Sequence, residues 1–295
     1  MNLDQYIKSL PEPLCNEAYR ELRRGIWDDP AISVYVNNAN DFAFLFPRPS
    51  VDYERYVTRS KKLGLEKDPE RFRRRYDKCQ PWLSGREKIL EVGASDGSFL
   101  RVLRDALPNS ALFCVEPDVS TLNARAEIGD VGLYASLADI RLAGHQFDVI
   151  CHFHVFEHIL EPAKFLADTA SLLSKGGIWI TEIPSMDDPL LSLYQNKAYE
   201  VFFFQRQHPF NYSRTSLQRV LHSHGFDIAD VIPHQRYGLD NHMSWMQTGQ
   251  PGGSEQWKGV LGPADDAYRR ALEASALTDS IIVVAARTGA GVFKK

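Results

Sequence analysis

A strand, a turn of small residues and a helix follow one another over residues 89–107, and this succession constrains the fold more than any other stretch. Ile89, Leu90 and Val92 form the short apolar run of a strand that is covered on both faces. Gly93, Ala94, Ser95 and Gly97 carry almost no side chain, and an apolar helical repeat then continues to Pro108. Because a ligand can lie against such a backbone at a helix N-terminus, we expect an open α/β sheet that binds a nucleotide-like cofactor.

Strands and helices alternate regularly after this turn. The expected strands are 111–115, 131–134, 147–151, 178–183, 226–232 and 280–286. Helices are expected over 120–127, from Pro162 to a stop at Gly176–Gly177, and from a cap at Ser213 to Gly225. This is a series of βαβ units, which predicts a mostly parallel sheet with right-handed crossovers.

The first 67 residues differ from the rest, because five prolines divide them into short pieces. Short helices are predicted over 3–10 and 16–27, a strand over 32–36, and an aromatic-rich apolar segment over 42–46. We expect residues 1–67 to form a helical cap and substrate region over a core domain of residues 68–295. Added segments often carry binding residues, so both ligand contact and simple packing stay open for this cap.

Basic residues outnumber acidic ones over 59–78. A helix is expected to start at Pro69, with Phe72, Tyr76 and Cys79 as its buried stripe. Its arginines indicate either a solvated helix face or a cationic rim that attracts a phosphorylated substrate.

Composition narrows the classes of protein. The formal net charge of −4 argues against a nucleic-acid binder, and 44% hydrophobic residues suffice for a sizeable core. We see no secretory signal and no apolar run long enough to span a bilayer. The four cysteines form no CxxC pair and indicate reduced thiols, so we expect a cytoplasmic protein of undetermined oligomeric state.

The choice of cofactor depends on the residues around the turn. The spacing Gly93-x-Ser95-x-Gly97 is not that of a dinucleotide site, and no GK[ST] follows as in a P-loop. Glu116 ends the second strand, where a carboxylate can accept bonds from ribose hydroxyls, and Glu91 could place a cationic amine. These two carboxylates favour S-adenosylmethionine over NAD.

Several motifs, in this order, resemble those of the class I S-adenosylmethionine-dependent methyltransferases: residues 91–97, 115–118, 147–150 with 155–162, and 173–180. The resemblance implies a Rossmann-like methyltransferase fold, which is a doubly wound, mostly parallel seven-stranded sheet with 280–286 as the antiparallel last strand. It also implies that residues 68–295 are the methyltransferase domain, with substrate-side insertions around 185–215 and 233–265. The implied cofactor contacts are Glu91, Gly93, Ser95, Gly97, Glu116, Ser136 (or Leu137), and the backbone near His152 and Phe153.

The candidate catalytic residues follow the fourth core strand, at the edge of the sheet where ligands bind. They are His154, Glu157 and His158, together with His208 in a later segment. Since an imidazole can remove a hydroxyl proton near neutral pH, we expect His158 or His208 to act as the base and Glu157 to orient it. A packing role for either histidine stays open.

Two metal patterns overlap this loop, H-x-x-E-H over 154–158 and H-x-H over 152–154, but neither suits a cofactor-binding βαβ series. The loop also resembles the Glu-x-x-Glu-His of ubiquinone-pathway O-methyltransferases, which implies a divalent metal there, with His154 in place of the first Glu. We expect no metal and retain His154, Glu157 and His158 as the alternative ligand set.

The segment around His208 is similar to that of deoxysugar C-methyltransferases, but Gln207 replaces their Glu and no cysteine-rich zinc site is visible. Both differences favour O-methylation. The polar and aromatic stretch 235–253 resembles methyltransferases of bacterial surface-polysaccharide clusters. Residues suited to a sugar ring are Tyr212, Tyr237, Asn241, His242 and Trp245.

We therefore expect an S-adenosylmethionine-dependent methyltransferase that acts on a hydroxyl of a sugar or glycan-related small molecule in polysaccharide biosynthesis. A C- or N-methyltransferase of another small metabolite is the first alternative. A non-catalytic, cofactor-binding module that regulates a partner is the second.

Overall fold

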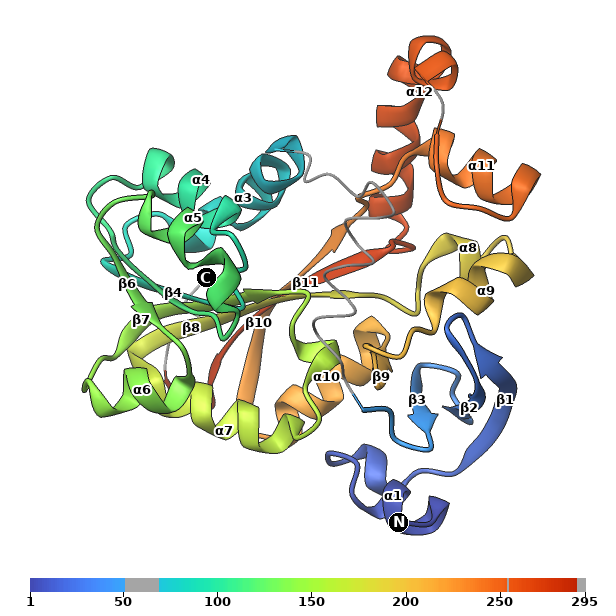
Figure 1. The fold of residues 1–295 in the computed structure, drawn as a ribbon, viewed down its shortest axis with the longest axis horizontal. Helices are drawn as coiled ribbons and strands as arrows, with labels where there is room; N and C mark the ends of the chain where they lie inside the picture. Colours follow the sequence, from blue (N-terminus) through green and yellow to red (C-terminus); the bar gives the residue numbers. More distant parts are fainter. Residues whose placement is uncertain (51–68, 254, 291–295) are drawn as a thin grey trace.

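The computed structural model describes residues 1–50, 69–253 and 255–290, and its centre is a seven-stranded sheet in the order β10-β11-β8-β7-β4-β5-β6 (Figure 1). The strands are β4 (Lys88–Val92), β5 (Ala111–Val115), β6 (Val131–Tyr134), β7 (Phe147–Phe153), β8 (Leu173–Pro184), β10 (Phe226–His234) and β11 (Ser280–Arg287). Neighbouring strands within the series β8-β7-β4-β5-β6 are parallel. In contrast, β11 is antiparallel to both of its neighbours, β8 and β10. The predicted doubly wound sheet with an antiparallel last strand is confirmed.

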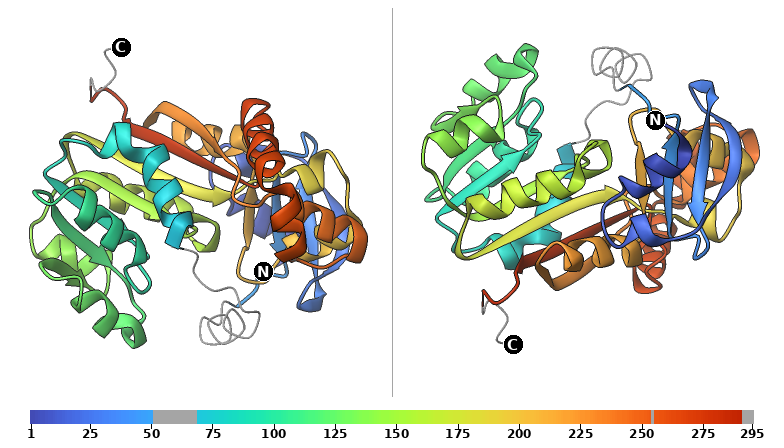
Figure 2. Two further views of the ribbon diagram at one scale, coloured as in Figure 1. Left: turned by 90° about the horizontal axis from the view of Figure 1, so that it is seen from above. Right: turned by 90° about the horizontal axis from the view of Figure 1, so that it is seen from below.

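Helices cover both faces of this sheet, because successive side chains of a strand point to opposite faces. On one face, α3 (Pro69–Leu83) and α4 (Ser98–Ala106) pack over Ile178 and Ile180 of β8. On the other face, α6 (Leu137–Leu142), α7 (Pro162–Leu172) and α10 (Arg214–Ser223) pack over a core that includes Trp179. Figure 2 shows these two layers from opposite sides. The remaining helices are α5 (Leu122–Ala126), α8 (Pro189–Ser192), α9 (Lys197–Phe203), α11 (Leu239–Thr248) and α12 (Glu255–Ala274), with 3₁₀ turns η1 (Leu14–Asn16), η2 (Val119–Thr121) and η3 (Phe156–His158).

The N-terminal region forms a second, four-stranded antiparallel sheet in the order β1-β2-β3-β9 (Figure 1). Its strands are β1 (Tyr19–Ile26), β2 (Asp29–Asn37), β3 (Phe42–Phe46) and β9 (Phe210–Tyr212). The helix predicted at the N-terminus is present as α1 (Leu3–Lys8), and the strand predicted over 32–36 lies within β2.

The helix predicted over 16–27 is wrong, and with it the expectation of a mainly helical cap. Tyr19–Ile26 pairs with β2 along its whole length, from Tyr19↔Asn37 to Ile26↔Asp29. The ladder and the burial of the Ile26 side chain outweigh the local helix preference of a charged segment. This pairing depends on residues outside the segment, so its own residues could not reveal it.

The cap shares a hydrophobic core with the large sheet. Tyr6, Phe42 and Phe44 belong to the same buried cluster as Trp179, and β9 enters the small sheet from the far part of the chain. A cap that packs on the core fits this arrangement better than an independent domain. The boundary predicted at residue 67 lies outside the described residues, as do the basic residues before Pro69.

Three smaller expectations can be compared with the structure. Tyr76 and Cys79 are buried in α3 as predicted, and Phe72 is packed beside them. The helix that starts at Pro162 ends at Leu172, so the predicted stop at Gly176–Gly177 is wrong: both glycines lie within β8. Within the described residues, no helix has the length and apolarity needed to cross a bilayer.

Candidate active site

The turn after β4 has a backbone that requires glycine at two positions. Gly93 and Gly97 have φ values of +77° and +78°, in the left-handed region that L side chains rarely adopt. A Cβ added at Gly93 would lie 2.5 Å from Cγ2 of Val155, and one at Gly97 would collide with Cδ1 of Ile128. Glycine is therefore required at both positions, by the backbone conformation and by the close packing of Val155 and Ile128.

Glu116 is joined to this turn by a hydrogen bond. The Ser95 amide donates to its Oε2 at 2.7 Å, and the Asp118 amide donates to its Oε1 at 2.9 Å. The carbonyl of Ser95 in turn accepts from Arg125 Nη1 at 2.6 Å. Each carboxylate oxygen has a second lone pair, so Glu116 can still accept from a ribose hydroxyl as predicted.

The other predicted cofactor residues occupy different environments. Glu91 is buried in β4, while the Ser136 hydroxyl accepts from the Asp139 amide and caps α6. The Phe153 ring packs on Phe99 with centroids 4.6 Å apart. The His152 side chain points into the core beneath Trp179, where burial lowers its pKa to about 3, so only its backbone is available to the cofactor.

The histidine loop lies directly beside the turn. β4 and β7 are adjacent parallel strands, so the turn and the loop leave the same edge of the sheet. Val155 of the loop is the residue that a Cβ at Gly93 would touch. The structure thus brings the predicted cofactor site and the predicted catalytic loop into contact.

Glu157, His158 and His208 form a cluster at this place, with one ligand atom from each lying within 4.8 Å of the others. Glu157 is only 2% exposed. His158 Nδ1 donates to the carbonyl of Gln207 at 2.6 Å, and the His158 and His208 ring centroids are 4.9 Å apart. Residues from two distant segments are therefore joined, as the prediction of either histidine as the base requires.

The electrostatics of the cluster favour an ionised carboxylate beside a neutral imidazole. Burial opposes the charge of Glu157, but the neighbouring His154, His158 and His208 outweigh it and lower its pKa to about 2. Burial, followed by the neighbouring His158, lowers the pKa of His208 to about 3. At neutral pH the His208 ring therefore offers a lone pair rather than a charge.

His154 contacts this cluster through Glu157 but also faces other charged groups. Its φ of +58° places it in the left-handed region, at the end of β7. Its Nε2 lies 3.0 Å from Arg236 Nη1 and 3.1 Å from Glu182 Oε1, while its Nδ1 lies 3.4 Å from Glu157 Oε1. Since both ring nitrogens face charged groups, a role in positioning suits His154 better than one as the base.

A buried network that sequence reasoning missed lies behind His154. Glu182 accepts from Arg75 Nε at 2.5 Å and from Ser280 Oγ at 2.8 Å, and Arg236 Nε donates to Asp279 at 2.9 Å. Glu182 interrupts the apolar run of its strand, and a carboxylate in such a run is the feature of the sequence that indicates a buried polar network. Its partners are far away in the sequence, so the network itself was not predictable.

The five residues expected to hold a sugar do not form one surface. Trp245 is buried against Tyr199 and Phe202, and His242 is buried with Nδ1 2.7 Å from the Tyr268 hydroxyl. Tyr212 is fully buried with its ring centroid 5.5 Å from that of Phe156. Only Tyr237 and Asn241 retain exposure. A ring-binding surface made of all five is therefore excluded by burial.

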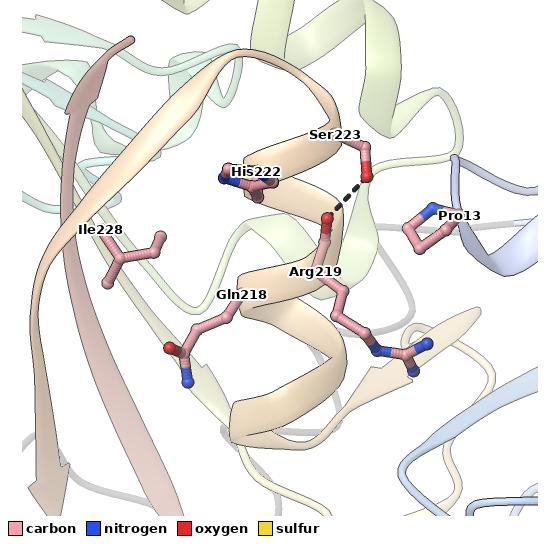
Figure 3. A pocket seen from close by; sticks show the side chains of 6 residues that line it. All are labelled: Pro13, Gln218, Arg219, His222, Ser223 and Ile228. Carbon is pink, nitrogen blue, oxygen red and sulfur yellow. Dashed lines mark hydrogen bonds between the residues drawn. The ribbon is translucent and has the colours of Figure 1, made fainter.

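A hollow on the outer side of α10 involves none of these residues. Figure 3 shows its lining by Pro13, Gln218, Arg219, His222, Ser223 and Ile228. Arg219 is held there by ion pairs with Glu17 and Asp41. The hollow is separate from the turn and the histidine cluster, and we assign no role to it.

Comparison with known proteins agrees with this geometry. Residues 65–231 match the family model of a methyltransferase domain. A probable S-adenosylmethionine-dependent methyltransferase of Mycolicibacterium smegmatis is 25% identical over 180 residues, which cover 57% of this chain and 64% of the relative. The chain thus spans less than two thirds of the length of this curated relative.

Two solved structures share the fold. The plantazolicin methyltransferase bound to a triazolic desmethylPZN analog and SAH has a TM-score of 0.53 at 13% identity, over 80% of this chain and 92% of that one. A SAM-dependent methyltransferase from Archaeoglobus fulgidus has a TM-score of 0.50 at 15% identity, over 79% of this chain and 99% of that one. At these identities the likeness concerns the fold alone.

Proposed function

The chain belongs to the methyltransferase-domain family, with S-adenosylmethionine as its cofactor, and from that premise we propose that it methylates a hydroxyl of a sugar or glycan-related small molecule. The acceptor hydroxyl would lie at the Glu157–His158–His208 cluster. One observation carries the proposal: the cluster adjoins the cofactor turn, through the contact of Val155 with Gly93.

The chemistry needs little beyond alignment and loss of a proton. The acceptor oxygen attacks the methyl carbon, the carbon–sulfur bond breaks, and S-adenosylhomocysteine leaves with the electron pair. The hydroxyl proton passes to His158 or His208, and the Glu157 carboxylate stabilises the imidazolium that forms. Holding donor and acceptor in line supplies the remaining rate enhancement.

Polar groups near the cluster are suited to a hydroxylated acceptor. The polar residues at this edge of the sheet include Arg236 and His154, which can bond to hydroxyl or anionic groups. O-methylation is preferred to C-methylation because Gln207 stands before His208 without a carboxylate. Tyr237 and Asn241 remain as proposed acceptor contacts.

The test is turnover with methyl-labelled S-adenosylmethionine over a panel of nucleotide sugars and glycans, with the methylated atom identified by NMR. We expect an O-methyl product. His208→Ala should lower turnover by about 10²–10⁴-fold, the usual contribution of a general base, while cofactor affinity stays within about 2-fold. The matched control is His222→Ala, which removes an exposed histidine on α10 and should leave both quantities unchanged.

Two outcomes would replace the proposal. Methyl on carbon or nitrogen would establish the C- or N-methyltransferase alternative. Tight cofactor binding with no turnover over the whole panel would favour the regulatory module.

A further inference from the structure

We infer that Glu157, His158 and His208 form a binding site for a divalent first-row transition-metal ion, such as Zn²⁺ or Mn²⁺. The binding site itself is independent of the proposed function. The use of the ion to activate an acceptor hydroxyl rests on that function.

The donor set is the first argument. Two imidazoles and one carboxylate are a common ligand set for such ions, and one ligand atom from each lies within 4.8 Å of the others. With metal–ligand bonds of about 2.1 Å, tetrahedral ligands lie about 3.4 Å apart. The separations between the three ligand atoms therefore have to shorten by up to about 1.4 Å for one ion to bind all of them.

The burial of Glu157 is the second and independent argument. The residue is 2% exposed, and within the described residues neither carboxylate oxygen accepts a hydrogen bond. His154 Nδ1 lies 3.4 Å from Oε1, which is long for such a bond. Buried carboxylates are normally paired, hydrogen-bonded or bound to a metal. The contact with His154 reaches only Oε1, so the Glu157 carboxylate can still bind a cation.

The orientation of His158 is the third argument. Its Nδ1 donates to the carbonyl oxygen of Gln207 at 2.6 Å, so the nitrogen through which this ring can bind an ion is Nε2. Metal-binding histidines are commonly oriented by such a bond from the opposite nitrogen. The same segment thus supplies both the orienting carbonyl and, in the next residue, the His208 ring.

The proposed ligand set shares Glu157 and His158 with the H-x-x-E-H pattern over 154–158, but it contains His208 in place of His154. His154 is directed towards Arg236 and Glu182 through Nε2, so that nitrogen is not available to an ion beside Glu157. His208 replaces it, from a segment that β9 attaches to the N-terminal sheet: the Leu45 amide donates to the Pro209 carbonyl at 3.0 Å. The cap therefore helps to complete the site.

Three protein ligands leave at least one coordination position open, as in catalytic zinc sites. A bound ion would supply Lewis-acid chemistry at that position, where it would lower the pKa of an acceptor hydroxyl. In the metal-bound form the imidazoles bind the ion instead of accepting the proton.

Metal binding can be measured without any acceptor. The full-length, untagged chain is treated with EDTA, desalted, and titrated with Zn²⁺ and Mn²⁺ by calorimetry, and with Co²⁺ by visible absorption. We expect one ion per chain and a Co²⁺ spectrum of nitrogen and oxygen ligands without thiolate charge transfer. Glu157→Gln and His208→Ala should each weaken binding by at least about 10-fold, whereas His222→Ala should bind as the wild type does.

Circular dichroism and cofactor titration establish that each variant is folded. If one of these variants does not fold, the metal site is tested by the stoichiometry and Co²⁺ spectrum of the wild type. His158→Gln then serves as a further ligand variant.

The inference is overturned if the wild type binds no ion, or if Glu157→Gln and His208→Ala bind as tightly as the wild type. Metal binding without methyl transfer to any acceptor would instead refute the proposed function. Full turnover of the chelated protein would refute only the use of the ion in the reaction.

Discussion

The cofactor turn and the Glu157–His158–His208 cluster adjoin one another at one edge of the sheet, yet they are built in opposite ways. The turn is made of the backbone of consecutive residues from Gly93 to Gly97, with left-handed glycines at both ends. The cluster is made of side chains, and 49 residues separate His158 from its partner Gln207. A site made of local backbone depends on a few small residues, whereas one made of distant side chains depends on the whole surrounding fold.

The N-terminal cap illustrates this difference between the turn and the cluster. The turn joins β4 to α4, and Glu116 after β5 and Arg125 of α5 hold its backbone. The cluster needs β9, which pairs with β3 through Phe42↔Tyr212 and Phe44↔Phe210. Damage to the turn should therefore affect the cofactor first, and damage to the cap should affect the cluster first.

Gly93→Val should have the largest effect, because Gly93 is where the two sites touch. A side chain there has an unfavourable φ and collides with the stiff, β-branched Val155. We expect cofactor affinity to fall by more than about 100-fold, which corresponds to more than about 2.7 kcal/mol, and the Co²⁺ spectrum of the cluster to change as well. Calorimetry with S-adenosylhomocysteine and Co²⁺ absorption measure the two effects. An unchanged affinity would refute our placement of the cofactor.

Gly97→Ala should separate the two sites. The new Cβ meets the flexible end of Ile128, so the main penalty is the left-handed backbone, which costs about 1–2 kcal/mol. Cofactor affinity should fall by about 10-fold, and metal binding should stay at the wild-type level. If the Co²⁺ spectrum changed as much as in Gly93→Val, the contact between Gly93 and Val155 would not explain the coupling.

Glu116→Gln tests the edge of the turn. The substitution keeps the shape but removes the charge that accepts from the Ser95 amide and, by our prediction, from the ribose. Losing a bond to a charged group costs about 1.5–3 kcal/mol, so affinity should fall by about 10-fold or more. Glu127→Gln, at an exposed position after α5, is the control and should bind normally. Equal affinities of the two variants would exclude Glu116 from the cofactor site.

Phe42→Leu should have the smallest effect and only on the cluster. Phe42 is fully buried, with its ring centroid 5.1 Å from that of Tyr212. The conservative change should cost about 1.5 kcal/mol or less in unfolding free energy and let β9 shift slightly. We expect turnover to fall a few-fold at unchanged cofactor affinity, as measured by steady-state kinetics and calorimetry. A larger loss of cofactor affinity than of turnover would contradict the division of roles between cap and turn.

Much of the large sheet could be predicted, because its strands contain continuous apolar runs such as Ala111–Val115 and residues 281–286. A strand covered on both faces needs such a run whatever its neighbours are. The small sheet could not be predicted in the same way. β1 is rich in charge and forms a strand only because β2 pairs with it, and β9 has only three residues.

The same distinction between local and distant contacts applies to the candidate site. Gly93, Gly97 and Glu116 were predictable, since a strand, a tight turn and a carboxylate about twenty residues later are a local pattern. His158 and His208 were recognised as separate candidates, but nothing in their sequence separation implies contact. Trp245 and His242 resembled ligand contacts by residue type, although burial assigns them to the core.

The sequence by itself determined the backbone turn and the order of the strands around it, because apolar runs, glycines and caps act within a few residues of where they stand. Only the tertiary structure decided which side chains meet beyond that turn. Glu157 is buried beside His158 and His208, and His154 is directed instead towards Arg236 and Glu182. The physical reason is that burial and ligand geometry are properties of packed neighbours, and those neighbours come from the cap, from β8 and from the segment after β10.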